Sequence, residues 1–221
     1  MFSNSTIQQG SDCIFATRDD AAKGVSAALL LFAYGSEPAE DTVCKDGLAI
    51  ALNGTAGILT DAIDQIIGSG AAGKLTAAKA LIDGAMKAAN RRVWELRLRL
   101  GQGICVGGFL LYSMGLEYEA IAWGGGAAYC LDAGGLRRIS HCSDLVCDAL
   151  GNSEFWQGNY FGGAFPLYGS IMGASCQPDP ACAAELISAM RPGVTDGRLT
   201  EIMYAALTQD PAPPAVIEIH K

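Results

Sequence analysis

One uncharged, apolar stretch, residues 103–116, constrains how this chain can fold more than any other feature. A helix that crosses a bilayer needs about 20 consecutive apolar residues, so this stretch is too short to be one. Glu117 and Glu119 follow it directly. The stretch is therefore predicted to be a buried β-strand, and no association with a membrane is expected.

A long amphipathic helix is predicted just before this strand, from about Lys74 to Leu100. Its apolar residues recur three or four positions apart, which places them in one stripe facing a core. They are Leu75, Ala78, Ile82, Ala85, Met86, Ala89, Val93, Leu96 and Leu100. Another helix is predicted to begin near Asp61 and to end at the glycine-rich residues 68–73.

Shorter apolar runs predict further strands. Residues 26–34 form one buried strand and residues 48–52 another, with a turn at Asp46-Gly47 before the second and a loop at 53–57 after it. A β-meander, an insertion rich in glycine and aromatic residues, two helices and two final strands are predicted in the rest of the chain. The ranges are 104–113, 118–123, 127–131 and 136–139 for the meander, 151–170 for the insertion, 182–190 and 196–207 for the helices, and 171–175 and 215–220 for the strands.

Composition indicates a single folded domain over residues 1–221. Half of the residues are hydrophobic (50%) and 17% are charged, so the chain can bury a core. The net charge of −8 makes nucleic acid an unexpected partner, because phosphate binding needs a basic surface. The N-terminus lacks a basic segment followed by an apolar run, so a cytoplasmic location is expected.

The eight cysteines are predicted to be reduced. They include no CxxC pair, and zinc needs clustered ligands. Cys105 and Cys130 lie inside apolar runs, where thiols pack as small hydrophobic groups.

The order of these predicted elements resembles the metal-dependent Ser/Thr phosphatases of the PPM (type 2C) family. Residues 48–57 stand where the family has a strand followed by Asp-Gly-x-Gly-Gly, and residues 82–96 stand where it has the next helix. Residues 122–140 are similar to its Gly-Asp-Ser-Arg-Ala-Tyr strand, tight turn and following strand. The resemblance covers about residues 46–146. It implies an α+β fold, a four-layer α-β-β-α sandwich with two mostly antiparallel sheets.

The resemblance also implies where a metal centre would lie. In that family two Mn²⁺ or Mg²⁺ ions share a bridging Asp and activate a water for attack on phosphorus. That Asp falls on Asn53, and the Gly that follows it falls on Gly54. Two other aspartates of the family's metal site fall on Cys176 and near Ala212, and the Asp of its Gly-Asp-Ser-Arg strand falls on Gly125. Hard cations need carboxylate oxygens, so no metal cofactor and no catalytic residue are expected.

The remnants of a phosphate site are expected at Arg18 and at Asp20, the nearby acid. Together these features predict a pseudophosphatase that acts by binding a partner protein, such as a kinase or a phosphoprotein, or by self-association. One alternative is an active phosphoprotein phosphatase whose Mn²⁺ or Mg²⁺ ligands are other acids, such as Asp46, Asp61, Asp196 or Asp210. A second alternative is another αββα protein, such as an Ntn-hydrolase, with a nucleophile exposed by processing; the candidates are Thr6 and Cys13.

Overall fold

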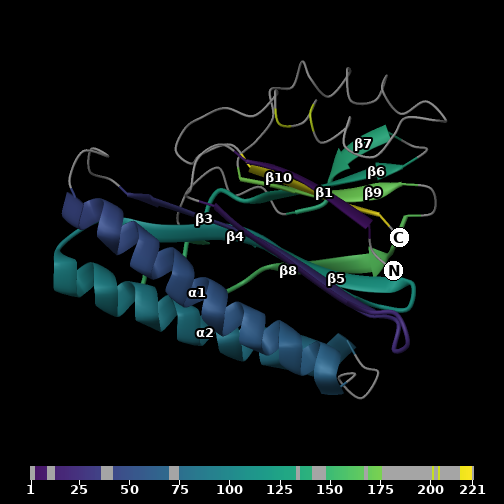
Figure 1. Cartoon of the computed structure of the whole chain (residues 1–221), viewed down its shortest axis with the longest axis horizontal. Helices are drawn as coiled ribbons and strands as arrows, with labels where there is room; N and C mark the ends of the chain where they lie inside the picture. The colour runs from purple at the N-terminus through teal and green to yellow at the C-terminus, as the bar shows by residue number, and fades with distance from the viewer. Residues whose placement is uncertain are drawn as a thin grey trace.

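The computed structural model has two β-sheets stacked face to face, with a pair of helices covering the outer face of one sheet (Figure 1). This confirms the predicted α+β sandwich with antiparallel sheets. The structure describes residues 3–8 (backbone only), 13–35, 42–69, 75–132, 135–140, 148–166, 169–175, 201, 204 and 215–220. The predicted helices at 182–190 and 196–207 lie outside these residues, except for Glu201 and Tyr204, which are helical.

Sheet B is the sheet that contacts the helices, and all of its neighbouring strands are antiparallel. At its centre, β3 and β4 are buried at every residue except the last. A strand covered on both faces has no reason to alternate apolar with polar residues, which explains their continuous apolar runs. The strand order is β2 (Cys13–Asp20), β3 (Val25–Gly35), β4 (Ile104–Met114), β5 (Glu117–Trp123) and β8 (Tyr160–Ala164).

Sheet A is also antiparallel throughout. The structure confirms the strands predicted near 127–131, 136–139, 171–175 and 215–220. It adds β1, β2 and β8, which the sequence pattern did not predict. The strand order is β1 (Ser3–Gln8), β10 (Ala215–His220), β9 (Ser170–Ala174), β6 (Ala127–Asp132) and β7 (Gly135–Arg138).

The predicted meander is split between the two sheets. After β5 the chain leaves sheet B and enters sheet A as β6, turning at Gly124, Gly125 and Gly126. Gly124 and Gly125 have positive φ values of 57° and 85°, which favour glycine. A Cβ on Gly126 would lie 2.2 Å from the carbonyl oxygen of Gly108 in β4. This triglycine corner therefore depends on the absence of side chains.

The two helices are α1 (Thr42–Ser69) and α2 (Leu75–Leu100). The second agrees with its prediction, including the buried stripe from Ala78 to Leu96. The turn at Asp46-Gly47, the strand at 48–52 and the loop at 53–57 were wrongly predicted, because all of these residues lie within α1. A five-residue apolar run can belong to a strand or to a buried helix, and the buried positions of α1 follow the helical period: Cys44, Gly47, Ala51, Leu52, Thr55, Ala56, Leu59, Ala62, Ile63 and Ile66.

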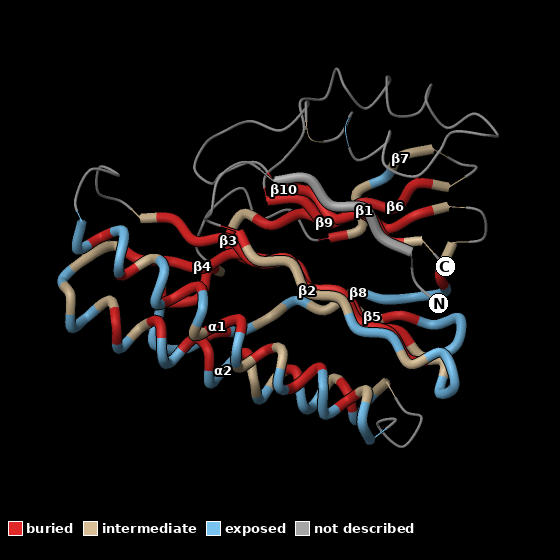
Figure 2. Tube along the Cα trace, viewed as in Figure 1, coloured by how far each residue is buried: buried red, intermediate tan, exposed pale blue. Residues whose placement is uncertain are grey.

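Buried residues form three apolar layers (Figure 2). One lies between the helices and sheet B and contains both Ile82 and Trp123, and the second lies between the sheets and contains Phe109 and Ile217. The third covers the outer face of sheet A, where Tyr204 packs against a buried cluster. Within the described residues, neither helix is long and apolar enough to span a membrane.

Cys105 and Cys130 are buried thiols, as predicted. The predicted insertion at 151–170 is partly regular, since it contains β8. The side chain of His220 is 23% exposed, with Nε2 3.3 Å from Oε1 of the buried Glu218.

Gly126→Ala should destabilise the protein by about 2–3 kcal/mol, because its Cβ would press on the backbone of β4. The matched control is Gly84→Ala in α2, where a Cβ would meet nothing within 4 Å. That change should stabilise the protein by about 0.5–1 kcal/mol, because alanine favours a helix. Urea denaturation of both variants measures the difference, and equal stabilities would contradict this account of the corner.

Candidate functional site

The strand that leads into the first long helix is β3, and it ends at Tyr34 and Gly35. Residues 48–57 were predicted to be this strand and its loop but lie within α1, so the basis for choosing Asn53 and Gly54 as metal-site positions is lost. Asn53 is exposed on α1, and its side-chain amide donates a hydrogen bond to the Ala49 carbonyl. Gly54 lies against the Arg92 side chain of α2, since a Cβ there would be 2.8 Å from Nε. Both residues are on the helix layer, away from the space between the sheets.

Tyr34 is buried in the layer between the sheets, with 8% of its surface exposed. Its hydroxyl donates a hydrogen bond of 3.1 Å to the carbonyl oxygen of Gly124. Its ring stacks on Phe32 with 6.2 Å between centroids. Burial raises the pKa of Tyr34 far above its ordinary value, and the nearby Cys105 and Asp148 raise it further. A hydrogen bond from a neutral phenol thus connects the end of β3 to the triglycine corner.

Asp148 also forms a hydrogen bond with the triglycine corner. Its Oδ1 accepts a hydrogen bond of 3.1 Å from the Gly124 amide, and its backbone carbonyl accepts one of 2.9 Å from Nε1 of Trp156. Cys105 is close by and buried, and burial raises the pKa of its thiol. The carboxylate of Asp148 therefore has a structural task at this end of the sandwich.

The end of β9 and the start of β10 meet beside the corner. The Ser175 amide donates to the Ala215 carbonyl at 3.0 Å, and the Ala215 amide donates to Ser175 Oγ at 2.9 Å. A Cβ built on Gly125 would lie 3.9 Å from the Ser175 carbonyl oxygen. Cys176 and Ala212 themselves lie outside the described residues, but Ser175 and Ala215, the nearest described residues, lie at this end of the sandwich.

We use "mouth" for the group formed by Tyr34, Gly124, Gly125, Asp148 and Ser175. The described part of the chain contains no group of three or more His, Cys, Asp or Glu side chains that could hold a metal ion. The donors of the mouth are a phenol, backbone groups, a serine hydroxyl and a carboxylate that is already hydrogen-bonded. This donor set does not fit a pair of hard divalent cations, which need several carboxylate oxygens.

Arg18 and Asp20 lie far from the mouth. Asp20 pairs with Val25 at the start of β3, nine residues from Tyr34, so about 30 Å of strand separates them. Arg18 Nε forms an ion pair of 2.9 Å with Asp64 of α1. The structure therefore does not bring this pair together with the other predicted site residues.

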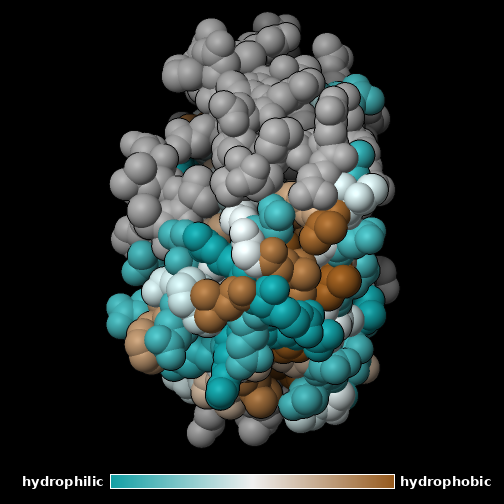
Figure 3. Space-filling view, turned by 90° about the vertical axis from the view of Figure 1, so that its left-hand side faces the viewer, coloured by the Kyte–Doolittle hydropathy of each residue, from teal (hydrophilic) through white to brown (hydrophobic). Residues whose placement is uncertain are grey.

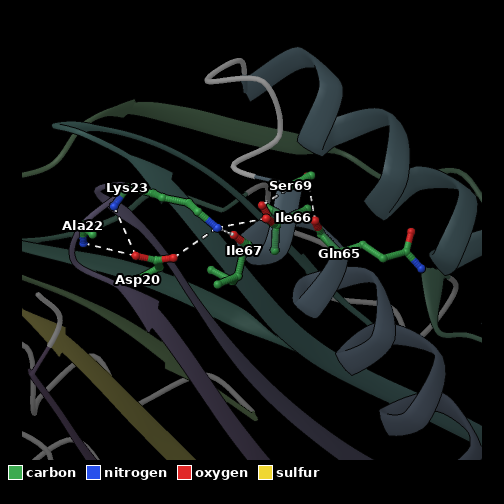
Figure 4. A network of polar contacts seen from close by, with 8 residues as sticks. Asp20, Ala22, Lys23, Gln65, Ile66, Ile67 and Ser69 are labelled. Atoms are coloured by element: carbon green, nitrogen blue, oxygen red, sulfur yellow. Dashed lines mark hydrogen bonds and ion pairs between the residues drawn. The ribbon is translucent and has the colours of Figure 1, made fainter.

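The contacts of Asp20 indicate a structural role (Figure 4). Its carboxylate accepts hydrogen bonds from the amides of Ala22 and Lys23 and forms an ion pair of 3.2 Å with Lys23 Nζ. The hydrogen bond to the Lys23 side chain is the main cause of the lowered pKa of Asp20. Lys23 Nζ also donates to the carbonyls of Ile67 and Gly68, both at 2.9 Å, near the end of α1. A cation stabilises this negative end of a helix.

Exposed apolar side chains gather on the helix layer. Figure 3 shows apolar and polar side chains mixed on the side where α1 begins and α2 ends. Val43 on α1 is 49% exposed and Leu98 on α2 is 63% exposed. Phe155, in the predicted aromatic insertion, is 80% exposed and lines a hollow of about 760 Å³ with Trp94 and Leu98.

Comparison with known proteins identifies the fold. No protein-family model matches the sequence, and no curated protein matches it. Solved structures do match over almost the whole chain. PppA of Pseudomonas aeruginosa, described as a key regulatory component of T6SS, aligns with a TM-score of 0.66 and 15% identity over 99% of this chain and 97% of its own.

Two Ser/Thr phosphatases match in the same way. The S. agalactiae enzyme gives a TM-score of 0.75 at 11% identity, covering 100% of this chain and 99% of its own. The catalytic domain of PstP, solved with two manganese ions, gives 0.65 at 13% identity, covering 99% of this chain and 96% of its own. The chain has the fold of the PPM-type Ser/Thr phosphatases, which confirms the resemblance predicted from the sequence.

Because the phenol of Tyr34 is buried in the mouth, we expect the free energy of unfolding to fall at alkaline pH. In the unfolded chain Tyr34 ionises near pH 10.0, whereas in the fold its raised pKa keeps it neutral. Its contribution to stability is therefore complete below pH 10.0 and is lost progressively as the pH rises from there. Tyr112 and Tyr160, whose pKa values burial also raises, act in the same direction. Denaturant titrations between pH 8 and pH 11 should show this decline.

Tyr34→Phe is the matched variant. It should lower the free energy of unfolding by about 1–2 kcal/mol at neutral pH, because the Gly124 carbonyl loses its buried hydrogen-bond donor. It should also reduce the decline above pH 10, since one ionisable phenol is gone. A variant as stable as the parent at neutral pH would show that the hydrogen bond from Tyr34 to Gly124 contributes nothing to stability.

Proposed function

We propose that this chain, with its PPM-type phosphatase fold, is a binding or regulatory protein that has lost the family's metal centre. The donor set of the mouth is the observation that carries the proposal. At the end of β3 the mouth has the phenol of Tyr34 and no carboxylate. The one acid of the mouth, Asp148, accepts a hydrogen bond from the Gly124 amide. Metal-assisted hydrolysis needs several anionic ligands, because their binding to the ions must offset the free energy of removing the ions' water.

The sequence next to the mouth supports the same conclusion. Cys176 directly follows Ser175, and Ala212 comes three residues before Ala215, so neither strand end carries an acid at the position that the resemblance assigns to an aspartate. A thiol or a methyl group cannot replace a carboxylate as a ligand for Mg²⁺ or Mn²⁺. We therefore expect no resident metal and no phosphatase activity.

A regulatory role agrees with the description of PppA as a regulatory component. The partner we infer is a protein, for which a kinase, a phosphoprotein and a second copy of this chain remain the candidates, and we expect the protein to work in the cytoplasm. The Ntn-hydrolase alternative gains no support from the structural neighbours, since those named above are phosphatases or a regulatory component.

Isothermal titration with Mn²⁺ tests the proposal, with the PstP catalytic domain as the positive control. This chain should show no binding of two ions at micromolar concentration. Hydrolysis of p-nitrophenyl phosphate in the presence of Mn²⁺ or Mg²⁺ should stay at the background rate, because no water is activated. Two bound ions together with turnover would refute the proposal.

Two alanine variants distinguish this proposal from the alternative of an active enzyme with displaced ligands. Asp12 directly precedes Cys13, the first residue of β2, in the sequence, and Asp210 precedes Ala215, the first residue of β10; both acids lie outside the described residues. Asp12→Ala and Asp210→Ala should leave metal binding and turnover at the same background as the parent. Activity in the parent that either variant abolishes would establish that acid as part of a working centre.

A further inference from the structure

Strand β8 forms one edge of sheet B, and among the described strands it pairs with β5 alone. It is short and uncharged, with the sequence Tyr-Phe-Gly-Gly-Ala. Gly162, Gly163 and Ala164 are exposed. The backbone on the free side of such a strand is available for pairing with another chain.

The hydrogen bonds between β8 and β5 define which backbone groups of β8 point outward. The Phe165 amide donates to the Leu116 carbonyl at 2.8 Å, which continues the pairing of Gly163 with Tyr118. In an antiparallel ladder, alternate residues point both backbone groups at the partner strand. Gly163 therefore faces β5, and the N–H and C=O groups of Gly162 and Ala164 face away from sheet B.

The other edge of sheet B carries features that oppose pairing with another chain. Strand β2 ends in Arg18, Asp19 and Asp20, whose charges discourage edge-to-edge association. Strand β8 has no charge and no proline. The two edges thus differ, and β8 is the edge whose sequence permits pairing with another chain.

One acidic side chain without an ion-pair partner among the described residues lies beside β8. Glu117 lies opposite Ala164 in the register and is exposed, and among the described residues it has no ion-pair partner. Glu119, the next acid on that face of β5, is occupied by Lys79 at 2.9 Å and by the Tyr112 hydroxyl. Glu117 and Glu119 line a hollow of about 440 Å³ beside β8, and the chain as a whole carries a charge of −8. An incoming strand with basic side chains complements this edge.

We propose that the β8 edge binds an extended, basic segment of a partner protein, which adds a sixth strand to sheet B. Backbone hydrogen bonds to Gly162 and Ala164 supply affinity, and a Lys or Arg of the segment pairs with Glu117. This inference goes beyond the proposed function and holds whether or not the mouth binds metal. A failure here would therefore leave the metal titration unaffected.

A fluorescein-labelled peptide, Lys-Val-Lys-Val-Lys-Val, serves as the probe, and fluorescence anisotropy measures its binding to the intact chain. Ala164→Pro removes one outward N–H and leaves the groups that face β5 intact, so it should weaken binding about tenfold. The matched control is Gly163→Ala, whose Cβ would meet nothing within 4 Å and whose N–H faces β5. It should bind as the parent does.

Two further measurements separate backbone pairing from charge alone. Glu117→Lys should weaken binding of the basic peptide about fivefold and favour a peptide with Glu in place of Lys. A basic peptide with N-methyl groups on alternate amides should bind about tenfold more weakly than its parent, because it cannot form the ladder. This comparison uses only the unaltered protein, so it remains valid if Ala164→Pro does not fold.

Three results would overturn the proposal. The first is no saturable binding of the basic peptide to the unaltered chain. The second is binding that neither Ala164→Pro nor N-methylation changes. The third is a dimer in light scattering that Ala164→Pro converts to a monomer, which would assign the edge to a second copy of this chain.

Discussion

The burial of β3 and β4 on both faces is the constraint on which the rest of the structure depends. One face of each strand contributes to the layer shared with α1 and α2, and the other contributes to the layer between the sheets. Leu29 and Leu31 face the helices, while Leu30 and Phe32 face sheet A. Neither layer can form without this central pair, because both use its side chains.

The mouth of the sandwich is closed by contacts that suit a neutral interior. A phenol bonds to a backbone carbonyl, a backbone amide bonds to Asp148, and a serine bonds to the neighbouring strand end. A metal centre would need the opposite arrangement, in which several acids remain available to a cation. The same fold can therefore hold either chemistry, and the side chains at a few strand ends decide between them.

The sequence predicted the elements with long, unambiguous patterns. The stripe of α2 and the apolar run of β4 are examples, and both agree with the structure. The edge strands β2 and β8 were missed because half-exposed or glycine-rich strands leave little apolar pattern. Residues 48–57 were misread because a short apolar run followed by Gly54 and Gly57 has the appearance of a strand and a loop.

That error also displaced the candidate site. It placed the key position at Asn53 on α1, whereas the strand before the long helix ends at Gly35, directly after Tyr34. The available signal was the apolar run 26–34 closed by Tyr34 and Gly35, with α1 beginning at Thr42. The hydrogen bond from Tyr34 to Gly124 could not be inferred from sequence, because it joins residues ninety positions apart through the packing of two sheets.

The triglycine corner also limits how β4 can pair with its neighbour β5. A Cβ on Gly124 would lie 2.8 Å from the Gly107 Cα, and one on Gly126 would lie 2.2 Å from the Gly108 carbonyl oxygen, so backbone meets backbone at both points. Sliding β4 by one residue would bring the side chain of Val106 or Phe109 into this contact, where there is no space for it. The corner thus fixes the register of β4 against the end of β5, at the point where the chain passes from one sheet to the other.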